Sequence, residues 1–433
     1  MAGSVQNIFK IPELKRRLLI TLALLAVYRI GVFVPTPGVD AAALTELFAG
    51  AQNALFGLYN MFTGGALEQF SVFSLGIMPY ISASIILQLL TAVVPHLERL
   101  KKEGEEGRKK ITQYTRYGTV LLSIIQGFGI AMLLESQRGV VTNPGWEFRL
   151  LTVITLTAGT AFIMWLGEQI TERGVGNGIS LIIFAGIVAR FPSAIAQTYE
   201  MTQVGQLSFF FVIALVLFML LVIAIINFFE QGQRRIPIQY AKRVVGRKMY
   251  GGQSSYLPLK INMAGVIPPI FAMALLGLPS TIIPAFQNVE WLQVLGMKMQ
   301  HGQLAFEITL VALIIFFCYF YTAITFNPTD VADNMRKQGG FIPGIRPGSK
   351  TAEYIDRVLS RITLWGALYI SAICVLPDIL MAHFGVPFYF GGTSLLIVVG
   401  VAIDTVSQIE SHMMSRHYEG FMKKGTAARV RGR

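Results

Sequence analysis

The chain contains the residue types that carry out catalysis, but they do not stand at catalytic spacings. No G-x-x-x-x-G-K-S/T segment is present to hold nucleotide phosphates, and no G-x-S-x-G segment is present to expose a nucleophilic serine. The five histidines also lack the short spacing of a metal site: His96, His301, His383, His412 and His417. Cys318 and Cys374 both lie in apolar stretches, where cysteine acts as a small packing residue. We therefore expect no enzymatic activity, no cofactor and no metal ion.

Charged or glycine-rich positions inside apolar stretches could mark an ion route or a nucleotide site. Residues 174–178, GVGNG, resemble half of a dinucleotide-binding fingerprint, but they open an apolar stretch instead of following a strand. Asp404 lies in the last apolar stretch, and Arg29 lies near the end of the first, where its side chain could reach the membrane interface. Because buried carboxylates carry protons or sodium in coupled carriers, their near absence argues against such a carrier.

The composition is that of an all-α polytopic membrane protein. The 433 residues are 53% hydrophobic and 14% charged, whereas soluble domains carry about 25% charged residues. A bilayer core needs about 20 residues of apolar helix. We expect ten transmembrane helices, near residues 18–34, 71–94, 115–134, 149–167, 178–199, 207–228, 259–285, 307–326, 362–380 and 390–412.

Positive charge lies on one side of these spans. Of the 36 Lys and Arg residues, 31 fall at the two termini and in alternate loops, and four fall in the opposite loops. Cytosolic loops carry the excess of Lys and Arg, so both termini are expected in the cytosol. Ten spans also divide into two fives, in residues 1–200 and 201–433. An odd number of spans per half inverts the second half in the membrane, as in an inverted repeat around a central pathway.

Residues 58–95 are too polar for a simple lipid anchor. No Asp, Glu, Lys or Arg occurs from residue 69 to 97, yet the stretch contains Pro79 and carries Ser71, Ser74, Ser82, Ser84, Gln88 and Thr91. A breaker cluster, TGGA at residues 63–66, comes just before this stretch. Non-helical backbone at membrane depth is tolerated only when protein or a water-filled cavity surrounds it. The composition leaves two alternatives open: a pathway through the membrane, and a serine-rich face that packs against neighbouring helices.

Two cytosolic loops, residues 229–260 and 327–361, are long and basic, and are punctuated by Gly, Pro and aromatic residues. The alternation in residues 235–240 predicts one strand of a hairpin, in which Pro237 must lie at an edge or a bulge. Attraction to anionic lipid explains the charge of these loops but not their punctuation. Since long structured loops commonly carry function, we favour a docking surface for a soluble partner.

The sequence resembles the SecY family, the channel subunits of bacterial Sec translocons, along essentially its whole length. The segments that carry the resemblance are residues 61–66, 76–84, 113–118, 167–174, 262–268, 344–348 and 387–398. The resemblance implies a passive channel in the bacterial inner (cytoplasmic) membrane. Such a channel passes unfolded secretory polypeptides across the membrane and membrane proteins laterally into it. The implied partners are SecE-like and SecG-like small subunits, the SecA motor ATPase, the ribosome, signal sequences, nascent polypeptides and the lipid bilayer.

The resemblance also assigns roles to residues of this chain. A plug would lie around residues 57–70 and include Asn60, Met61, Phe62, Thr63, Gly64, Gly65, Ala66 and Leu67. A pore ring would be drawn from Ile77, Ile81, Ile85, Ile179, Ile183, Ile270 and Ile397, with membership of Ile77 and Ile85 left open. The polar contact across a lateral gate between the second and seventh spans would involve Ser82, Gln126 and Asn262. Partner docking would involve Arg234, Arg235, Lys242, Arg243, Arg346 and Lys350.

A secondary transporter with inverted repeats is the main rival. It would also have ten spans, but it would hold a solute and a buried ion partner near the midplane. An intramembrane enzyme is a more distant rival, because the chain lacks a nucleophile–base pair. The spacing of Ile77, Ile81 and Ile85 places them on one helix face, but does not decide between these classes, since isoleucine is common on lipid-facing and core positions.

Overall fold

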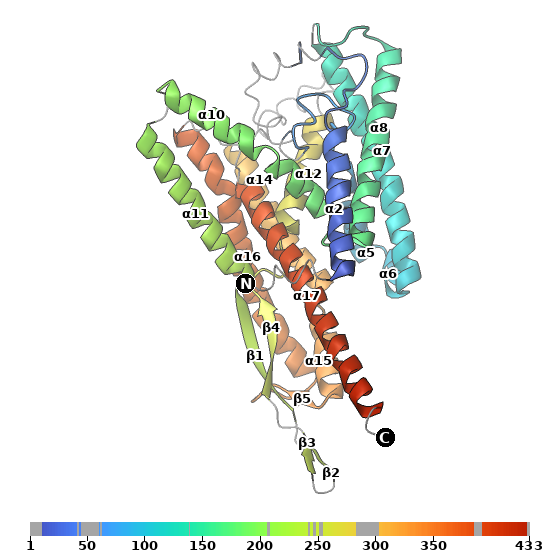
Figure 1. Ribbon diagram of the computed structural model, residues 1–433, viewed down its shortest axis with the longest axis vertical. Coiled ribbons are helices and arrows are strands. Elements are labelled where there is room, and N and C mark those ends of the chain that lie inside the picture. Colours follow the sequence, from blue (N-terminus) through green and yellow to red (C-terminus); the bar gives the residue numbers. More distant parts are fainter. Residues whose placement is uncertain are drawn as a thin grey trace. The chain divides into compact units, whose positions relative to one another are not determined.

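The computed structural model describes residues 11–40, 43–44, 60, 63–137, 139–205, 208–240, 243–245, 248–250, 254–282, 303–384 and 392–430. Helices make up most of the described chain, which also contains two small sheets (Figure 1). It forms two compact units. Unit 1 comprises Met1–Met201, Ala274–His301 and Val401–Arg433, and unit 2 comprises Thr202–Met273 and Gly302–Gly400.

Helices of membrane-spanning length confirm the class of the protein. Among the described residues, seven helices are long and apolar enough to cross a bilayer, or eight if the bent pair Met78–Val93 and Pro95–Lys102 is one span. Helix α2 (Pro12–Gly31) falls where a first span is expected but carries several charges, and the apolar helix Ile267–Gly277 is shorter than a bilayer requires. The count of ten spans therefore remains a proposal.

Unit 1 is built around α5, α7 and α8, which pack against one another. Its helices before residue 204 are α2, α5 (Met78–Val93), α6 (Pro95–Lys102), α7 (Glu105–Ser136), α8 (Trp146–Arg173), α9 (Gly178–Val188) and α10 (Phe191–Gln203). Pro95 ends α5, because a proline removes a backbone donor and restricts the residue before it, and α6 leaves at 98°.

Two expected spans begin later in the structure than the sequence predicts. The span expected at 71–94 becomes helical only at Met78. Pro79 lies in the first turn of this helix, where a backbone N–H has no partner within the helix, so the missing proline N–H costs nothing. Residues 63–77, which we call the turn segment, are non-helical, and Gly76 has a φ of 56°. The span expected at 259–285 becomes α12 (Ile267–Ile282), since Leu259 and Lys260 belong to a strand.

The GVGNG motif forms the turn before α9 and its first residue, where α9 packs closely against α8. The Asn177 side chain caps α9 by accepting from the backbone N–H groups of Ile179 and Ser180. A Cβ placed on Gly178 would lie 1.9 Å from the carbonyl oxygen of Gly167 in α8. The glycine thus allows α8 and α9 to approach closely, which accounts for the motif by packing.

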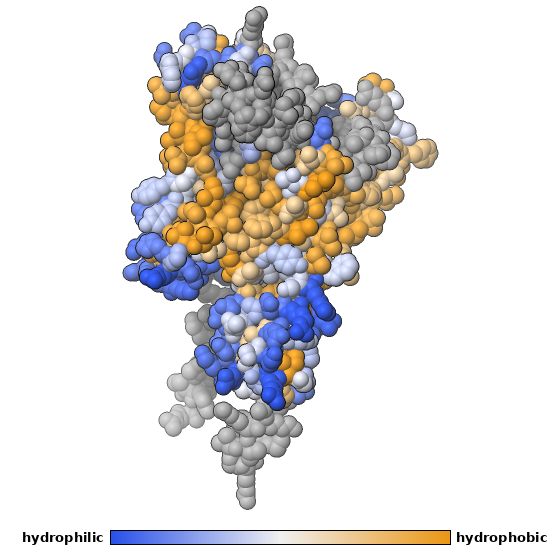
Figure 2. All heavy atoms as spheres, turned by 180° about the vertical axis from the view of Figure 1, so that it is seen from behind, coloured by the Kyte–Doolittle hydropathy of each residue, from blue (hydrophilic) through white to orange (hydrophobic). Residues whose placement is uncertain are grey.

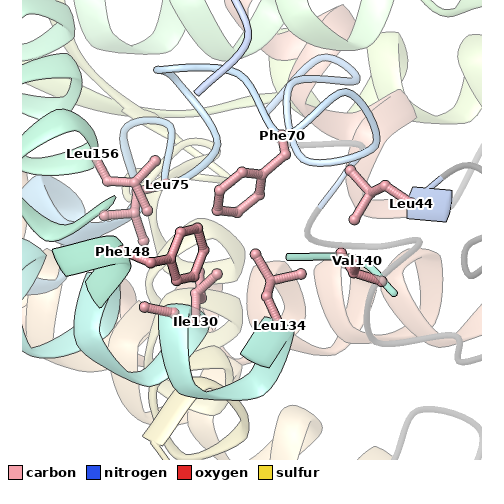
Figure 3. Packing of buried hydrophobic residues seen from close by; sticks show 9 residues of the cluster. Leu44, Phe70, Leu75, Ile130, Leu134, Val140, Phe148 and Leu156 are labelled. Carbon is pink, nitrogen blue, oxygen red and sulfur yellow. The ribbon is translucent and has the colours of Figure 1, made fainter. Parts of the chain in front are cut away.

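A buried apolar cluster fixes the turn segment inside unit 1 (Figure 3). Phe70 and Leu75 of the turn segment pack there with side chains of α7 and α8 and of the segments beside them. The cluster comprises Leu44, Phe70, Leu75, Ile130, Ala131, Leu134, Val140, Phe148 and Leu156. Phe70 is buried although its φ is 43°, a conformation that non-glycine residues rarely adopt. Turn hydrogen bonds within the segment and this tertiary packing together hold it in place.

Unit 2 contains α11 (Phe209–Gln231), β1 (Gln233–Tyr240), β2 (Arg243–Val245), β3 (Lys248–Tyr250), β4 (Ser254–Lys260), α14 (Leu304–Thr325), α15 (Pro328–Lys337), β5 (Gly340–Phe341) and α16 (Ser349–Phe384). Helix α12 begins in unit 2 and continues into unit 1, as does α17 (Gly392–Val430).

The predicted hairpin strand is confirmed. Strand β1 pairs antiparallel with β4 from Gln233↔Lys260 to Gln239↔Ser254, and β5 adds to its other edge only at Gln239 and Tyr240. Pro237 therefore faces an edge that carries no strand partner, as the lack of a proline N–H requires.

The two long loops form one body. Ile236 and Ile238 point from alternate positions of β1 into a core that also receives Met335 of α15 and Ile355 of α16. We call this body, made of β1, β4, β5, α15 and the first turns of α16, the loop platform. Figure 2 shows hydrophilic side chains over this part of unit 2 and apolar side chains over its long helices.

Candidate functional site: a pinned segment, buried isoleucines and a basic platform

The segment expected as a plug is seated tightly in unit 1. Of that expectation, Asn60 and residues 63–70 are described, whereas residues 57–59, Met61 and Phe62 lie outside the described residues. Gly64 and Gly65 adopt φ values of 67° and 92°, which favour glycine. A Cβ on Gly64 would lie 2.8 Å from the Cα of Gly186 in α9, so the segment passes directly against that helix.

Helix α2 holds the same segment by two side chains. The Tyr28 hydroxyl donates to the carbonyl of Thr63 at 3.2 Å, and Arg29 Nη1 donates to the carbonyl of Gly64 at 2.7 Å. Tyr28 is 1% exposed, and its ring stacks on Phe73 with centroids 6.0 Å apart. Arg29 is thus not a lipid-snorkelling residue, as its position suggested, but a donor to the turn segment.

Glu68 forms the third attachment. Arg190 Nη2 lies 2.9 Å from Glu68 Oε2, which also accepts from Asn60 Nδ2 at 3.0 Å. The Glu68 backbone N–H donates in turn to Asn60 Oδ1 at 3.1 Å. The Arg190 side chain is 18% exposed and that of Glu68 is 44% exposed, so solvent screens this charge pair in part. Sequence reasoning missed the pair because its members stand 122 residues apart.

Several of the polar residues in 71–94 have partners close by in the chain. Ser74 Oγ donates within the turn segment, to the carbonyl oxygens of Ser71 at 2.6 Å and Ala66 at 3.0 Å. Gln88 Nε2 donates to Ser84 Oγ at 3.1 Å within α5. These groups stabilise local structure. Ser82 differs, because its hydroxyl is buried and has no hydrogen-bond partner among the described residues.

The isoleucines expected in a pore ring are mostly buried. Ile77, Ile81, Ile85 and Ile183 in unit 1, and Ile270 and Ile397 in unit 2, are each at most 5% exposed. Ile179 is half-buried and lies against Gly167 of α8. Five of the seven belong to unit 1 and two to unit 2, so the ring itself remains a proposal.

The three expected gate residues have different surroundings. Gln126 of α7 is 2% exposed, and its Oε1, like the Ser82 hydroxyl, has no partner in the described part of the chain. Both side-chain donors of Asn262 in unit 2 are used, because its Nδ2 donates to Glu230 Oε1 at 2.6 Å and to the carbonyl of Gly265 at 3.0 Å. Sequence reasoning did not single out Glu230, which stands at the end of a long apolar run.

Of the residues expected to dock partners, Arg234, Arg235 and Lys350 lie on the loop platform, and Arg346 lies in the turn between its β5 and α16. Arg234, Arg235 and Arg346 are exposed, and the Arg235 guanidinium lies 5.3 Å from the Tyr256 ring centroid. Arg346 sits in a turn between Gly344 and Gly348, which have φ values of 81° and 106°. Lys350 pairs with Glu353 at 2.9 Å on the surface. Lys242 lies outside the described residues, and Arg243 is described only as part of β2.

One ion pair joins two of the segments that the sequence singled out. Arg116 of α7 donates to both oxygens of Glu168 in α8, at 2.9 and 2.7 Å. Such a bidentate contact fixes the orientation of the two side chains as well as the distance between them. Residues 113–118 and 167–174 therefore hold α7 and α8 in register.

Comparison with known proteins agrees with this architecture. The SecY family model matches residues 71–406. Protein translocase subunit SecY of Escherichia coli K12 is 53% identical over 418 residues, which cover 95% of this chain and 94% of the relative. The fold is similar to a solved structure on the plug domain of the SecY protein, described as stabilising the closed state of the translocation channel and maintaining a membrane seal. The TM-score is 0.68 at 19% identity, over 95% of this chain and 97% of the other. Sec61 in the canine ribosome-channel complex has a TM-score of 0.65 at 18% identity, with the same coverage.

Proposed function

The chain belongs to the SecY family, and we propose from this premise that it is the protein-conducting channel of a bacterial translocase. The observation that carries the proposal is the 53% identity to a protein translocase subunit over 95% of the chain. The protein is a multi-pass protein of the bacterial cytoplasmic membrane. Unfolded secretory polypeptides cross through it, and membrane proteins leave it sideways into the lipid. The channel itself is passive, without enzymatic activity.

The channel has ten spans in two inverted halves, residues 1–200 and 201–433, with both termini in the cytosol. Helices α2 and α12 lie where the first and the seventh spans are expected. Their length and composition alone do not identify them as membrane spans. The location of 31 of the 36 Lys and Arg residues supports the orientation.

The plug is the segment around residues 57–70. Support comes from its non-helical backbone inside a helical unit, and from its three attachments through Tyr28, Arg29 and Arg190. When the plug leaves, these hydrogen bonds and the ion pair can be exchanged for water, while the apolar packing of Phe70 adds to the closed state.

The pore ring consists of isoleucines at the narrowest point, and the gate lies between α5 and α12. An apolar ring blocks ions by dewetting and adapts to a passing chain without binding it. The buried Ser82 hydroxyl and Gln126 carbonyl support a polar contact at the gate, because a polar group buried without a partner is costly and gains from one.

The loop platform receives the partners that supply energy, which are SecA or the translating ribosome. Exposed guanidinium groups of Arg234, Arg235 and Arg346 suit carboxylates of a motor protein or phosphates of ribosomal RNA. Small SecE-like and SecG-like subunits complete the channel in the bilayer.

Reconstitution tests the function directly. The purified protein is placed in lipid vesicles with its small subunits, and SecA, ATP and a preprotein are added outside. We expect protease-protected preprotein that depends on ATP and on an intact signal sequence. Absence of protection under these conditions would contradict a channel. Ion-dependent uptake of a small solute, abolished by one mid-membrane substitution, would favour the transporter.

A further inference from the structure

Asn262 is held within its own unit by a contact that the gate does not explain. It is 4% exposed and lies between β4 and α12. Its side-chain nitrogen donates to Glu230 Oε1 at 2.6 Å and to the Gly265 carbonyl at 3.0 Å. An amide nitrogen has two protons, so both donors of Asn262 are used.

Glu230 is itself fixed in position. It lies in the last turn of α11 and is 8% exposed. The preceding residue, Phe229, stacks on Tyr369 of α16 with ring centroids 4.3 Å apart and planes 11° apart. This contact holds the end of α11 against α16. A carboxylate with so little access to water depends on hydrogen bonds from the protein, and Asn262 supplies one.

The Glu230–Asn262 pair lies beside one end of the β1–β4 ribbon, the end at which β1 begins and β4 ends. The Ile261 N–H donates to the Gly232 carbonyl at 2.9 Å, and the strand pairing begins one residue further, at Gln233↔Lys260. A Cβ on Gly232 would lie 2.6 Å from Ile261 Cδ1, so the two chains are in close contact here. The same ribbon carries Arg234 and Arg235. Only two residues separate Glu230 from β1, and only one separates Asn262 from β4, so a displacement of the platform would also move the pair.

We propose that Glu230 is a positioning residue for the gate: it holds the Asn262 amide in the resting arrangement until a partner on the loop platform shifts the ribbon. The inference rests on the proposed gate role of Asn262. Releasing Asn262 deprives a buried carboxylate of a charge-assisted hydrogen bond, which favours the resting arrangement. Glu230 thereby makes opening of the gate depend on both the signal sequence and the docked partner.

The test measures how strictly the channel demands a signal sequence. In vesicles with the small subunits and SecA, the readout is the amount of protected preprotein with a disrupted signal sequence, divided by that with an intact one. Glu230→Ala is expected to raise this ratio about tenfold, the scale of one charge-assisted hydrogen bond. Glu230→Gln keeps an oxygen that accepts from Asn262 but loses the charge, so its ratio is expected to lie between those of the wild-type protein and Glu230→Ala.

A double-substitution cycle shows whether Glu230 acts through Asn262. Asn262→Ala should raise the ratio as Glu230→Ala does, and the double variant should not exceed either single one. Glu230→Asp keeps the charge but shortens the side chain, and should behave as Glu230→Ala; it carries the test if the alanine variant does not fold. Gln231→Ala, at the exposed next position, should leave the ratio unchanged.

The outcomes separate the inference from the proposed function. If the wild-type protein does not protect an intact preprotein, the channel function fails. If it does, but Glu230→Ala and Glu230→Asp both keep the wild-type ratio, the positioning role is overturned and the channel function stands. Additive effects of Glu230→Ala and Asn262→Ala would likewise show that Glu230 acts elsewhere.

Discussion

Arg190, in the break between α9 and α10, lies 2.9 Å from Glu68, so the proposed plug is bound by charge to the helices beside it. The contact joins residues 122 positions apart, and Asn60 shares the same carboxylate. The plug is therefore held by polar groups that can exchange their partners for water, in addition to the apolar packing of Phe70.

Removing this ion pair should loosen the closed channel. Glu68→Gln and Arg190→Gln are each expected to raise the resting ion conductance by a few fold, since partly exposed pairs contribute about 1 kcal/mol or less. Bilayer recordings without SecA measure the leak. Glu98→Gln breaks the exposed pair with Lys102 and serves as the control. Glu68→Arg combined with Arg190→Glu should restore the seal, and a leak that persists in this variant would contradict the ion pair.

Gly64 and Gly65 offer a matched pair for testing whether the closed channel needs close packing of the plug against α9. Both have positive φ, so Gly64→Ala and Gly65→Ala share a strain of about 1 kcal/mol. Only the new Cβ at position 64 meets other atoms, the Cα and carbonyl oxygen of Gly186 and Nη1 of Arg29, whereas nothing lies within 4 Å at position 65. We expect Gly64→Ala alone to give a leaking channel in conductance recordings. Equal leaks from both variants would attribute the effect to strain.

The pore ring can be tested by making it polar. Replacing Ile81, Ile183 and Ile397 together by Ser should let water wet the constriction, so the resting channel should conduct ions. Ile154→Ser, on an exposed face of α8, is the control for added polarity. A channel that remains tight after the triple replacement would reject these residues as the ring.

Arg346→Glu tests the docking role of the loop platform. Arg346 is exposed in a turn framed by Gly344 and Gly348, so its replacement removes no buried contact of the side chain. We expect transport driven by SecA to fall about tenfold or more, as reversal of a charge in a charge-matched interface does, with an unchanged melting temperature. Arg108→Glu makes the same charge change at an exposed position of α7, outside the loop platform. Equal transport in both variants would remove Arg346 from the docking site.

The sequence by itself determined the class of this protein. Charge-free runs as long as a bilayer is thick predict helices wherever they occur, because an unpaired backbone cannot lie in lipid. The alternation in residues 235–240 predicted β1, and the structure confirms it. The edge position of Pro237 also followed from local chemistry, since proline lacks an N–H.

Only the tertiary structure decided which distant residues meet. Composition could not show that 71–77 is turn instead of helix, because the apolar core around Phe70 and Leu75 holds that backbone in place. Nor could it show that the two long loops share one core, since the burial of Ile236 and Ile238 depends on Met335 and Ile355, about a hundred residues away along the chain. The contacts of Arg29, Glu68 and Glu230 could likewise not be predicted from the sequence. A charged side chain at the end of an apolar run has the same sequence signature whether it reaches water or a buried partner, and only the folded chain brings that partner within 3 Å.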